Sequence, residues 1–384
     1  MAVGAGLLTV LLAGACSDGG DVVPDRSAGA DRDPASTTTL APRSFTLVAT
    51  GDVLLHPALW DQAAADAAAA GAPGHDFGPL LAALRPLVSS AGVAICHLET
   101  PVAPAGGPYA GYPSFSVPPE IAPALAATGY DACTTASNNT FDRGAEGVDR
   151  TLDALDAAGL GHAGSARTPE EAATTTLLEV DGVDVALVSY TFGFNGIPAP
   201  AGETWRANVI DEARILADAG VARQRGAEVV VVALHWGDEL RHDLNGQQEE
   251  LAPRLIGSPD IDLLLGHHAH VVQPVEPIAG EWVVYGMGNL VSHHAERTPE
   301  KLEGLLVRFT FTETPAGWRT TAAEFAPLLT DDRGPIRVLD VRRSLADPAT
   351  DPGLRGSLQA ADDRTTAIVD QRGATQAGLR PIGG

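Results

Sequence analysis

The feature that most constrains the fold of this chain is the apolar run at residues 263–265, which stops at Gly266 and leads into His267, His268 and His270. An earlier apolar run, residues 229–234, leads in the same way into His235. Short apolar runs that are rich in β-branched residues or bounded by glycine predict buried strands. Open α/β sheets bind ligands at the carboxyl ends of their strands, and imidazole is a frequent metal ligand. We therefore expect a metal centre there.

Three other predicted strands end in the same manner. The segments 45–50, 93–98 and 131–136 each lead into a polar side chain, respectively Asp52, Glu99 and Asn138. Carboxylate, amide and imidazole donors together suit Mn, Fe or Zn better than a thiolate site would. These donors are numerous enough to hold two divalent metal ions.

The order of the predicted elements indicates the fold class. Further predicted strands at 183–190 and 282–287 alternate with predicted helices at 76–88, 145–159 and 211–225. Such alternation is typical of βαβ units in which helices cover a sheet, and it predicts an α/β fold. Three strand-rich segments then follow without helices between them, which predicts a meander that completes a second sheet: 305–312, 318–325 and 336–341.

The composition is that of an acidic protein with an ordinary core. The chain has 384 residues, a net charge of −24 and a pI near 4.6. Its length allows one large domain or two smaller ones. Because nucleic-acid binding depends on excess positive charge facing the phosphates, we expect no nucleic acid as a partner.

The N-terminus has the composition of a secretory signal. Residues 3–15 are apolar, too short to span a membrane, and end at Cys16 in a sequence similar to a bacterial lipobox. We therefore expect residues 1–16 to be a signal peptide whose Cys16 is lipidated, which places the protein outside the cytoplasm, anchored to the cell membrane. Ala13 stands three positions before the cysteine and no basic residue precedes the run, so an uncleaved apolar tail is the alternative.

The remaining boundaries follow from composition. Residues 17–43 are rich in Asp, Gly, Ser, Thr and Pro, and we expect a disordered linker because they cannot bury enough apolar surface to fold. The folded domain is expected at 44–345, followed by a loosely packed helix or tail at 346–384. Cys96 and Cys133 can pair in an oxidising compartment, although two buried free thiols are the favoured interpretation.

Six motifs occur in order along the chain: GDVL at 51–54, HLETP at 97–101, ASNNTFDRG at 136–144, LHWGDE at 234–239, GHHAHV at 266–271 and YGMGNL at 285–290. Together they resemble the CapA family of capsule (poly-γ-glutamate) synthesis proteins, within the calcineurin-like metallophosphoesterase superfamily. The resemblance covers about residues 45–345. It implies a four-layer αββα sandwich with metals at the strand ends.

The resemblance also implies a ligand set. Asp52 and His270 match the ligands of a first metal, and Glu99 matches the carboxylate that bridges two metals. The second metal would be held by the residues that match its ligands, Asn138, His235 and His268. His267 is a ligand only if the register shifts by one; otherwise it would orient the ligands, as would Asp238 and Glu239.

Two departures from the superfamily pattern concern catalysis. Asn139 stands where members usually have a histidine that protonates the leaving group, and an amide cannot supply a proton at neutral pH. His56 and His97 are the nearby candidates for that role. Leu54 stands where phosphoesterases often have a further metal-binding histidine. These changes favour metal binding over phosphatase turnover.

Substrate contacts are expected from the segment between the ligand strands. Arg143 can clamp a phosphate or carboxylate through two hydrogen bonds, or it can pair with Asp142 or Glu146 on the surface. The loop around Tyr112 and Ser114 is rich in Pro and Gly, and loops in this position often contact substrate. A structural lid is the alternative for this loop.

Three functions remain open. The first is a metal-dependent hydrolase that acts on a phosphoester or on a bond of an extracellular anionic polymer. The second, implied by the resemblance, is an accessory protein of capsule polymer synthesis or export that works with a membrane complex. The third is a metal-dependent module that binds the polymer.

Overall fold

Two β-sheets form the centre of the structure, a computed structural model that describes residues 41–383. The larger sheet has the order β14-β13-β12-β1-β2-β3-β4, with β11 beside β1 and β15 beside β13. Its strands are β1 Ser44–Val53, β2 Val93–Leu98, β3 Ala132–Thr134, β4 Gly161–Ala163, β11 Asn289–Val291, β12 Glu303–Thr314, β13 Gly317–Asp331, β14 Arg337–Asp340 and β15 Leu379–Pro381.

The smaller sheet has the order β5-β6-β7-β8-β10-β9. Its strands are β5 Thr176–Val180, β6 Val183–Thr191, β7 Val229–His235, β8 Leu263–His267, β9 Val275–Ile278 and β10 Glu281–Val284. The helices are α1 Pro57–Ala69, α2 Gly78–Leu81, η1 Ala82–Leu84, α3 Arg85–Val88, α4 Ile121–Thr128, α5 Gly144–Ala157, α6 Pro169–Ala172, η2 Thr204–Arg206, α7 Glu212–Gln224, α8 Gly246–Ile256, η3 Pro299–Leu302, α9 Val341–Ala346 and α10 Pro352–Val369.

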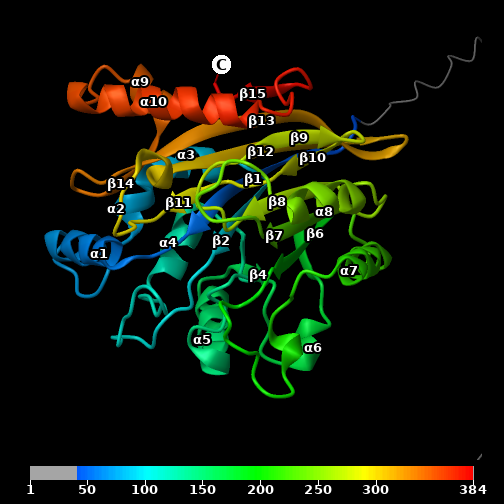
Figure 1. Ribbon diagram of the computed structural model, residues 1–384, viewed down its shortest axis with the longest axis horizontal. Helices are drawn as coiled ribbons and strands as arrows, with labels where there is room; N and C mark the ends of the chain where they lie inside the picture. Colours follow the sequence, from blue (N-terminus) through cyan, green and yellow to red (C-terminus); the bar gives the residue numbers. More distant parts are fainter. Residues whose placement is uncertain (1–40, 384) are drawn as a thin grey trace, which may run out of the picture. The chain divides into compact units, whose positions relative to one another are not determined.

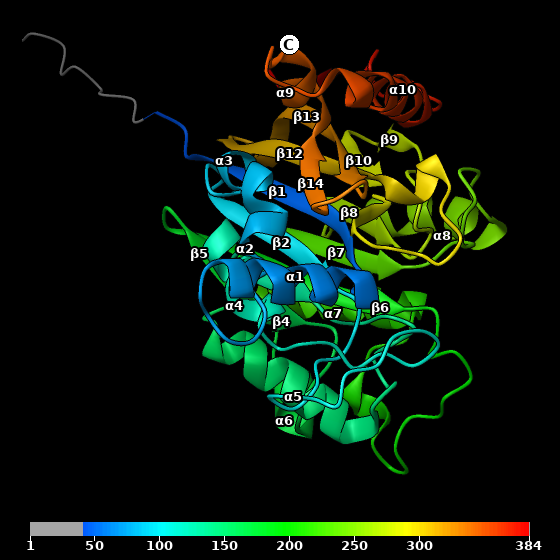
Figure 2. The same cartoon turned by 90° about the vertical axis from the view of Figure 1, so that its left-hand side faces the viewer.

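The two sheets pack face to face, and alternate residues of the central strands reach opposite layers. Leu47 of β1 and Val231 of β7 lie in the core between the sheets. Val48 packs with residues of α1, α2, α4 and α5, and Val232 packs with residues of α7 and α8. Strands buried on both faces read as continuous apolar runs, which is why the sequence identified them. The predicted αββα sandwich is confirmed (Figures 1 and 2).

The predicted meander exists, but it belongs to the other sheet. β12 pairs antiparallel with β1, which sets Phe311 opposite Phe45 and Phe309 opposite Leu47. β12, β13 and β14 therefore extend the larger sheet, whereas the second sheet is formed by β5 to β10. The expectation that the meander completes a second sheet was wrong, because strand pairing over this sequence distance depends on which apolar faces meet.

The C-terminal segment is packed more tightly than expected. Leu354, Leu358 and Ala361 of α10 are buried against Leu329 and Val341. Figure 1 shows α10 lying along β13, and β15 adds a parallel strand to β13. A helix was predicted within 346–384, but the segment is part of the sandwich and not a loose tail.

At the other end, the fold begins one residue before the predicted boundary. The guanidinium of Arg43 forms ion pairs with Glu228 and Glu313, so this residue is fixed to the sandwich. The predictions for residues 1–16, for lipidation at Cys16 and for the linker up to residue 40 lie outside the described residues. Within residues 41–383, no helix combines the length and apolarity needed to cross a membrane.

Cys96 and Cys133 form a disulfide. They are direct neighbours on the parallel strands β2 and β3, and both are fully buried. The favoured interpretation of two free thiols was therefore wrong. The pairing register of two strands decides whether the sulfur atoms meet, and the sequence does not specify that register.

Candidate metal centre

Side chains from both sheets meet at one end of the sandwich. Asp52 and His97 lie at the ends of β1 and β2, and His235 and His267 lie at the ends of β7 and β8. Gly51 lets β1 approach the segment before β11, since a Cβ there would lie 2.2 Å from the carbonyl oxygen of Gly288. This close approach lies within the larger sheet. The smaller sheet joins it where His267 of β8 contacts Asp52 of β1, so strand ends of both sheets form one buried cluster.

Asp52 is the centre of this cluster. Its Oδ1 lies 2.8 Å from His267 Nδ1, and its Oδ2 lies 3.1 Å from His270 Nδ1. The backbone N–H of His268 also donates to Oδ2 at 3.2 Å. Because an ionised carboxylate can only accept, Nδ1 of His267 and of His270 carries a hydrogen, and Nε2 is the ring nitrogen that each could offer to a cation after losing any proton there.

The backbone after β8 turns sharply to bring these histidines together. His268 and His270 have φ angles of 90° and 54°, in the left-handed region that non-glycine residues rarely adopt. Such strain is held in place by surrounding structure and is concentrated at functional sites. Asn289 supplies part of this support, since its Oδ1 lies 3.1 Å from His270 Nδ1 and its Nδ2 donates to the His270 carbonyl.

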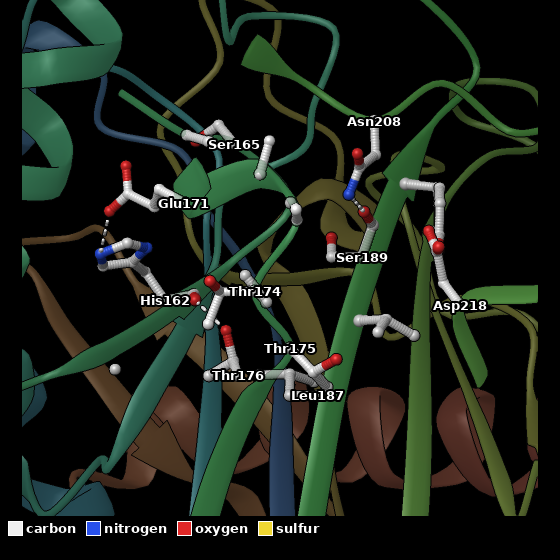
Figure 3. Close-up of a pocket in the computed structure, with 18 of the residues that line it drawn as sticks. His162, Ser165, Glu171, Thr174, Thr175, Thr176, Leu187, Ser189, Asn208 and Asp218 are labelled. Atoms are coloured by element: carbon white, nitrogen blue, oxygen red, sulfur yellow. Dashed lines mark hydrogen bonds and ion pairs between the residues drawn. The ribbon is translucent and has the colours of Figure 1, made fainter. Parts of the chain in front are cut away.

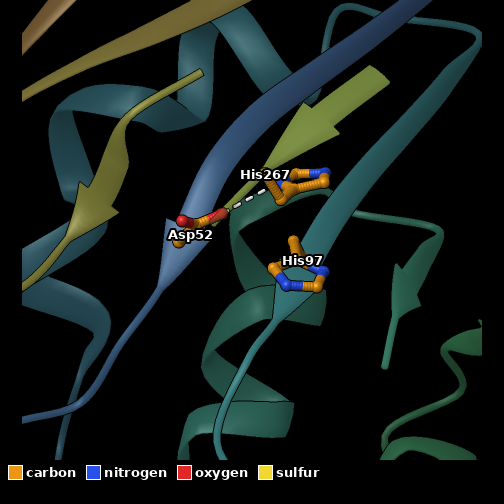
Figure 4. A group of neighbouring side chains, drawn as sticks. All are labelled: Asp52, His97 and His267. Atoms are coloured by element: carbon orange, nitrogen blue, oxygen red, sulfur yellow. Dashed lines mark hydrogen bonds and ion pairs between the residues drawn. The ribbon is translucent and has the colours of Figure 1, made fainter. Parts of the chain in front are cut away.

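Two overlapping groups of buried side chains around Asp52 have the spacing of metal ligands. One group is Asp52, His97 and His267 (Figure 4), and the other is Asp52, Glu99 and His270. Within each group the donor atoms lie within 4.8 Å of one another. The ring of His97 stacks on that of His267, with 4.1 Å between centroids.

A further set of donors lies beside this one. His235 Nε2 is 3.1 Å from Asn138 Oδ1, and His235 Nδ1 is 3.0 Å from His97 Nε2. His268 and His270 form a third group with metal-ligand spacing, together with the exposed Glu239. The centre therefore contains carboxylate, amide and imidazole donors in number sufficient for more than one ion.

Burial and crowding shift the protonation of these groups. Burial raises the pKa of Glu99 to about 8 and lowers that of His268 to about 4. Burial also acts to lower the pKa of His270, but the carboxylates of Glu99 and Asp52 outweigh it and raise the value to about 9. For Asp52, burial acts to raise the pKa, and the hydrogen bonds from His267 and His270 reverse this and hold it well below the usual range.

Two of the buried donor atoms have no hydrogen-bond partner among the neighbouring side chains that the structure describes, which is the arrangement expected of metal ligands. Glu99 Oε2 and His268 Nδ1 are buried without a hydrogen-bond partner in the part of the chain that the structure describes. A buried polar atom without a partner costs about 1–3 kcal/mol, so native structures rarely leave such atoms unpaired. A divalent cation would give both atoms a partner and would offset the charge of the two buried carboxylates.

The family model of the bacterial capsule synthesis protein PGA_cap matches residues 46–294. The chain belongs to this family. The match covers the strand ends described above, and the predicted resemblance to CapA proteins is confirmed.

Curated relatives agree with this placement. The PGA biosynthesis protein CapA of Bacillus subtilis is 28% identical over 169 residues, which cover 42% of this chain and 42% of the relative. A probable polyglutamine synthesis accessory protein of Mycobacterium tuberculosis is 27% identical over 223 residues, 53% of this chain and 56% of the relative. The chain thus spans about half the length of these relatives.

Solved structures with a similar fold include a calcineurin-like phosphoesterase and a nucleotidase. One is the calcineurin-like phosphoesterase YfkN of Bacillus subtilis, with a TM-score of 0.46, 13% identity, and 86% of this chain and 100% of that chain covered. Another is a 5'-nucleotidase precursor of Thermus thermophilus, with a TM-score of 0.47, 15% identity, and coverage of 85% and 59%. At this level of similarity, neither structure bears on the ligands or the reaction of this PGA_cap protein.

The structure brings together all six predicted ligands of this PGA_cap protein and adds two histidines. His267 was expected to orient ligands, yet it contacts Asp52 directly and has ligand spacing with it. His97 was expected as a proton donor, but it is fully buried and both of its ring nitrogens are engaged, Nδ1 with Thr134 and Nε2 with His235. That placement suits a role in the ligand cluster and not proton transfer to a leaving group.

The other two expected catalytic residues lie at the edge of the cluster. Asn139 Nδ2 donates to Glu99 Oε1 and to Asn138 Oδ1, both at 3.0 Å, so it orients two oxygen donors. The ring of His56 packs at a tilt against that of His294, which in turn packs edge-on against His270. The ring of His294 therefore lies between His56 and the ligand His270. The role of His56 as a proton donor remains a prediction.

The predicted substrate clamp has another function in the structure. Arg143 donates from Nε to the carbonyl of Phe115 at 2.9 Å and from Nη2 to that of Ser114 at 2.6 Å. The Ser114 hydroxyl donates to the carbonyl of Asp142. Arg143 and Ser114 thus hold the loop in place, as expected if the loop is a structural lid. Tyr112 of the same loop is 82% exposed.

Asp238 and Glu239 were expected to orient ligand imidazoles. The carboxylate of Asp238 is exposed and accepts a hydrogen bond from Asn245, so it does not hold a ligand ring. Glu239 lies with His268 and His270 at ligand spacing, closer to the centre than expected.

Three residues of the centre were missed because their types carry no signal on their own. Asn289 supports His270, and Phe192 and Asn195 follow β6, whose end has no acidic residue or histidine. Asn289 lies in the YGMGNL motif, which was recognised without a role for this residue. Aromatic packing on a ligand ring can be recognised only from the structure.

A cavity of about 670 Å³ lies between β4, β6 and α7, and no residue of the metal centre lines it (Figure 3). Most of its polar side chains are paired with one another or with the backbone. Asn208 donates to the Ser189 carbonyl, Asp218 accepts from Tyr190, and His162 lies 3.7 Å from Glu171. The cavity therefore offers few free groups for chemistry, and the strand ends remain the candidate site.

Proposed function

We propose that this protein acts in the synthesis of poly-γ-glutamate or a related capsule polymer, and that its buried centre holds two divalent ions of Mn, Fe or Zn for phosphoesterase-like hydrolysis. Membership of the PGA_cap family and the names of the relatives support the biosynthetic part. The substrate would be a phosphoester or a bond of an extracellular anionic polymer.

The observation that carries the metal part is a pair of buried atoms that have no hydrogen-bond partner within residues 41–383, Glu99 Oε2 and His268 Nδ1, beside the carboxylate of Asp52. When bound, two divalent ions lower the pKa of a water molecule and polarise a phosphoryl or carbonyl oxygen. They would also screen the strongly acidic protein from a polyanionic polymer, because they add positive charge where the polymer would approach.

The side chains around the centre have separate tasks in this proposal. Asn139 keeps the oxygens of Glu99 and Asn138 in place. His56 Nδ1 lies 3.2 Å from two backbone groups, the N–H of His293 and the carbonyl oxygen of Leu54, so this ring nitrogen is held by the backbone. Burial lowers the pKa of His56 to about 4, so the ring carries no charge at neutral pH.

A second candidate function is a non-catalytic, metal-dependent role in binding or exporting the polymer. The weakness of the available proton donors favours this role. Asn139 has an amide, which does not supply a proton, and burial lowers the pKa of both His56 and His97, so neither ring is protonated at neutral pH. A leaving group would then need its proton from bulk water, which gives slow turnover.

We further propose that the protein lies outside the cytoplasm, held at the membrane through a lipid on Cys16, where it can meet a capsule-synthesis membrane complex. The disulfide between Cys96 and Cys133 supports this location, because such bonds persist mainly in oxidising compartments. Mass spectrometry of the protein from membranes of its host tests it, since an unmodified Cys16 contradicts the lipid anchor.

The decisive experiment is elemental analysis of the purified full chain after incubation with Mn²⁺, combined with hydrolysis assays on a generic phosphodiester and on poly-γ-glutamate. Asp52→Asn is the test variant, because it removes the central carboxylate charge and retains the size of the side chain. His162→Ala is the matched control, since this histidine lies outside the centre.

About two ions per chain with turnover, lost in Asp52→Asn and kept in His162→Ala, would support the hydrolase. Two ions without turnover on either substrate would favour the non-catalytic role. Absence of bound metal in the wild type would overturn both versions of the centre.

A further inference from the structure

The segment that follows β6 contacts the ligand cluster at several points. The backbone N–H of Phe192 donates to the carbonyl of His235 at 3.0 Å, and the Phe192 ring packs on that of His268 with 4.5 Å between centroids. The same ring lies parallel to that of His235, at 6.3 Å. One aromatic side chain thus packs on one of the imidazoles that were assigned to a second metal and lies beside the other.

Asn195 of this segment reaches the third residue of that set. Asn138 Nδ2 donates to Asn195 Oδ1 at 3.3 Å. With its N–H₂ group held there, the amide of Asn138 presents Oδ1 toward His235 Nε2, 3.1 Å away. Asn139 donates to the oxygen of the Asn138 amide and Asn195 accepts from its nitrogen, so the two residues together set the amide with its oxygen toward the centre, and only the oxygen can bind a cation.

The backbone of the segment is built for this placement. Asn195 has a φ of 51°, in the left-handed region that asparagine tolerates better than most residues, and Gly196 continues the turn with a φ of 75°. Phe194, between the two contacts, packs its ring on Phe141 at 4.5 Å and fixes the segment to the loop that carries Asn138. The segment thereby links the smaller sheet to a ligand loop of the larger sheet.

The residues assigned to the first metal have different supports. His270 is held by Asn289, and Asp52 by the backbone of His268 and by Gly288, all outside the β6 segment. Phe192 is 42% exposed and Asn195 is also exposed, so core packing does not require either side chain. Their contacts with the ligand set need another explanation.

We propose that the segment 192–195 is a positioning element for the second cation, in which Asn195 orients the amide of Asn138 and Phe192 fixes the rings of His235 and His268. The inference rests on the proposed two-cation centre. It adds that the segment 192–195 determines the affinity of the second cation site and not that of the first. Neither residue touches the first site, so their removal should separate the two binding steps.

The test is a titration of the metal-free full chain with Mn²⁺, followed by electron paramagnetic resonance, which distinguishes free ions, single bound ions and coupled pairs. Asn195→Gly removes the acceptor and permits the same backbone conformation. Asn195→Asp retains an acceptor oxygen at the same place and is the matched rescue variant. Phe192→Ala tests the aromatic contact independently.

The second Mn²⁺ should bind about 10- to 100-fold more weakly in Asn195→Gly and in Phe192→Ala, the usual effect of losing a contact that orients a ligand. The first step should be unchanged, the signal of coupled pairs should fall, and Asn195→Asp should restore it. If the wild type binds two ions and both variants bind the second Mn²⁺ as tightly as the wild type does, the inference is overturned while the proposed two-cation centre stands. If the wild type binds fewer than two ions, the proposed centre fails and the inference fails with it.

Discussion

The disulfide between Cys96 and Cys133 makes a quantitative prediction about stability. The two residues are 37 positions apart in sequence and adjacent in the sheet, so the bond closes a loop of about that length in the unfolded chain. The loop-entropy relation gives about 4 kcal/mol of stabilisation at 25 °C for such a loop. Reduction should remove this amount, because the thiols would still fill the same buried space.

The assay is urea unfolding with and without reductant, followed by tryptophan fluorescence, in a Cys16→Ser background that leaves two cysteines in the chain. Under reducing conditions we expect the free energy of unfolding to fall by about 4 kcal/mol. We also expect the denaturant dependence to steepen, since an uncrosslinked unfolded chain exposes more surface.

Thiol counting on the unfolded, unreduced protein provides an independent check. The structure predicts that Cys96 and Cys133 do not react, whereas the interpretation from sequence predicts two reactive thiols. Two thiols, or equal unfolding midpoints with and without reductant, would refute the reasoning. Because Cys96 directly precedes His97, the reduced protein also shows whether the bond affects metal uptake.

Three further predictions test other parts of the structure. Arg143→Ala should speed thermolysin cleavage within the loop around Ser114, because the guanidinium donates to two carbonyls of that loop. Leu358→Ala should cost about 2–5 kcal/mol in urea unfolding, because this side chain of α10 is fully buried; a loose tail would show almost no loss. Burial raises the folded-state pKa of Asp142 to about 6, so the folded protein binds its proton more tightly than the unfolded chain does. Stability should therefore fall as pH rises from about 4 to about 6, and unfolding midpoints measured across this range should fall less in Asp142→Asn.

The part of the fold that the sequence predicted is the part with local signals. β7 and β8 are buried on both faces, so their apolar runs are continuous, and their last residues must lie at the same edge of a parallel sheet. Asp52 and Glu99 were found by the same rule. The carboxyl ends of parallel strands in one sheet lie at the same edge, and this is why these side chains could be expected near one another before the structure. Their assignment to two metals came from the resemblance to the CapA family.

The features that were missed depend on pairing or on backbone atoms. The sequence cannot show that β12 lies beside β1, or that Cys96 lies opposite Cys133. Arg143 was expected to bind substrate because a guanidinium suits anions, yet its partners are carbonyl groups of a loop, and every residue type supplies those. Phe192 was missed because an aromatic residue after a strand usually indicates core, and only its packing on His268 gives it a place at the centre.

The centre joins both sheets, and this couples metal binding to folding. Asp52 comes from the larger sheet and His267 from the smaller one, so the donors converge only when the sandwich has formed. A ligand that binds only the folded state stabilises it by about 2.7 kcal/mol at a hundred times its dissociation constant. Chelation should therefore lower the unfolding midpoint of the wild type and leave that of Asp52→Asn unchanged. Equal midpoints with and without Mn²⁺ in the wild type would show that the strand ends hold no cation, whatever reaction is assayed.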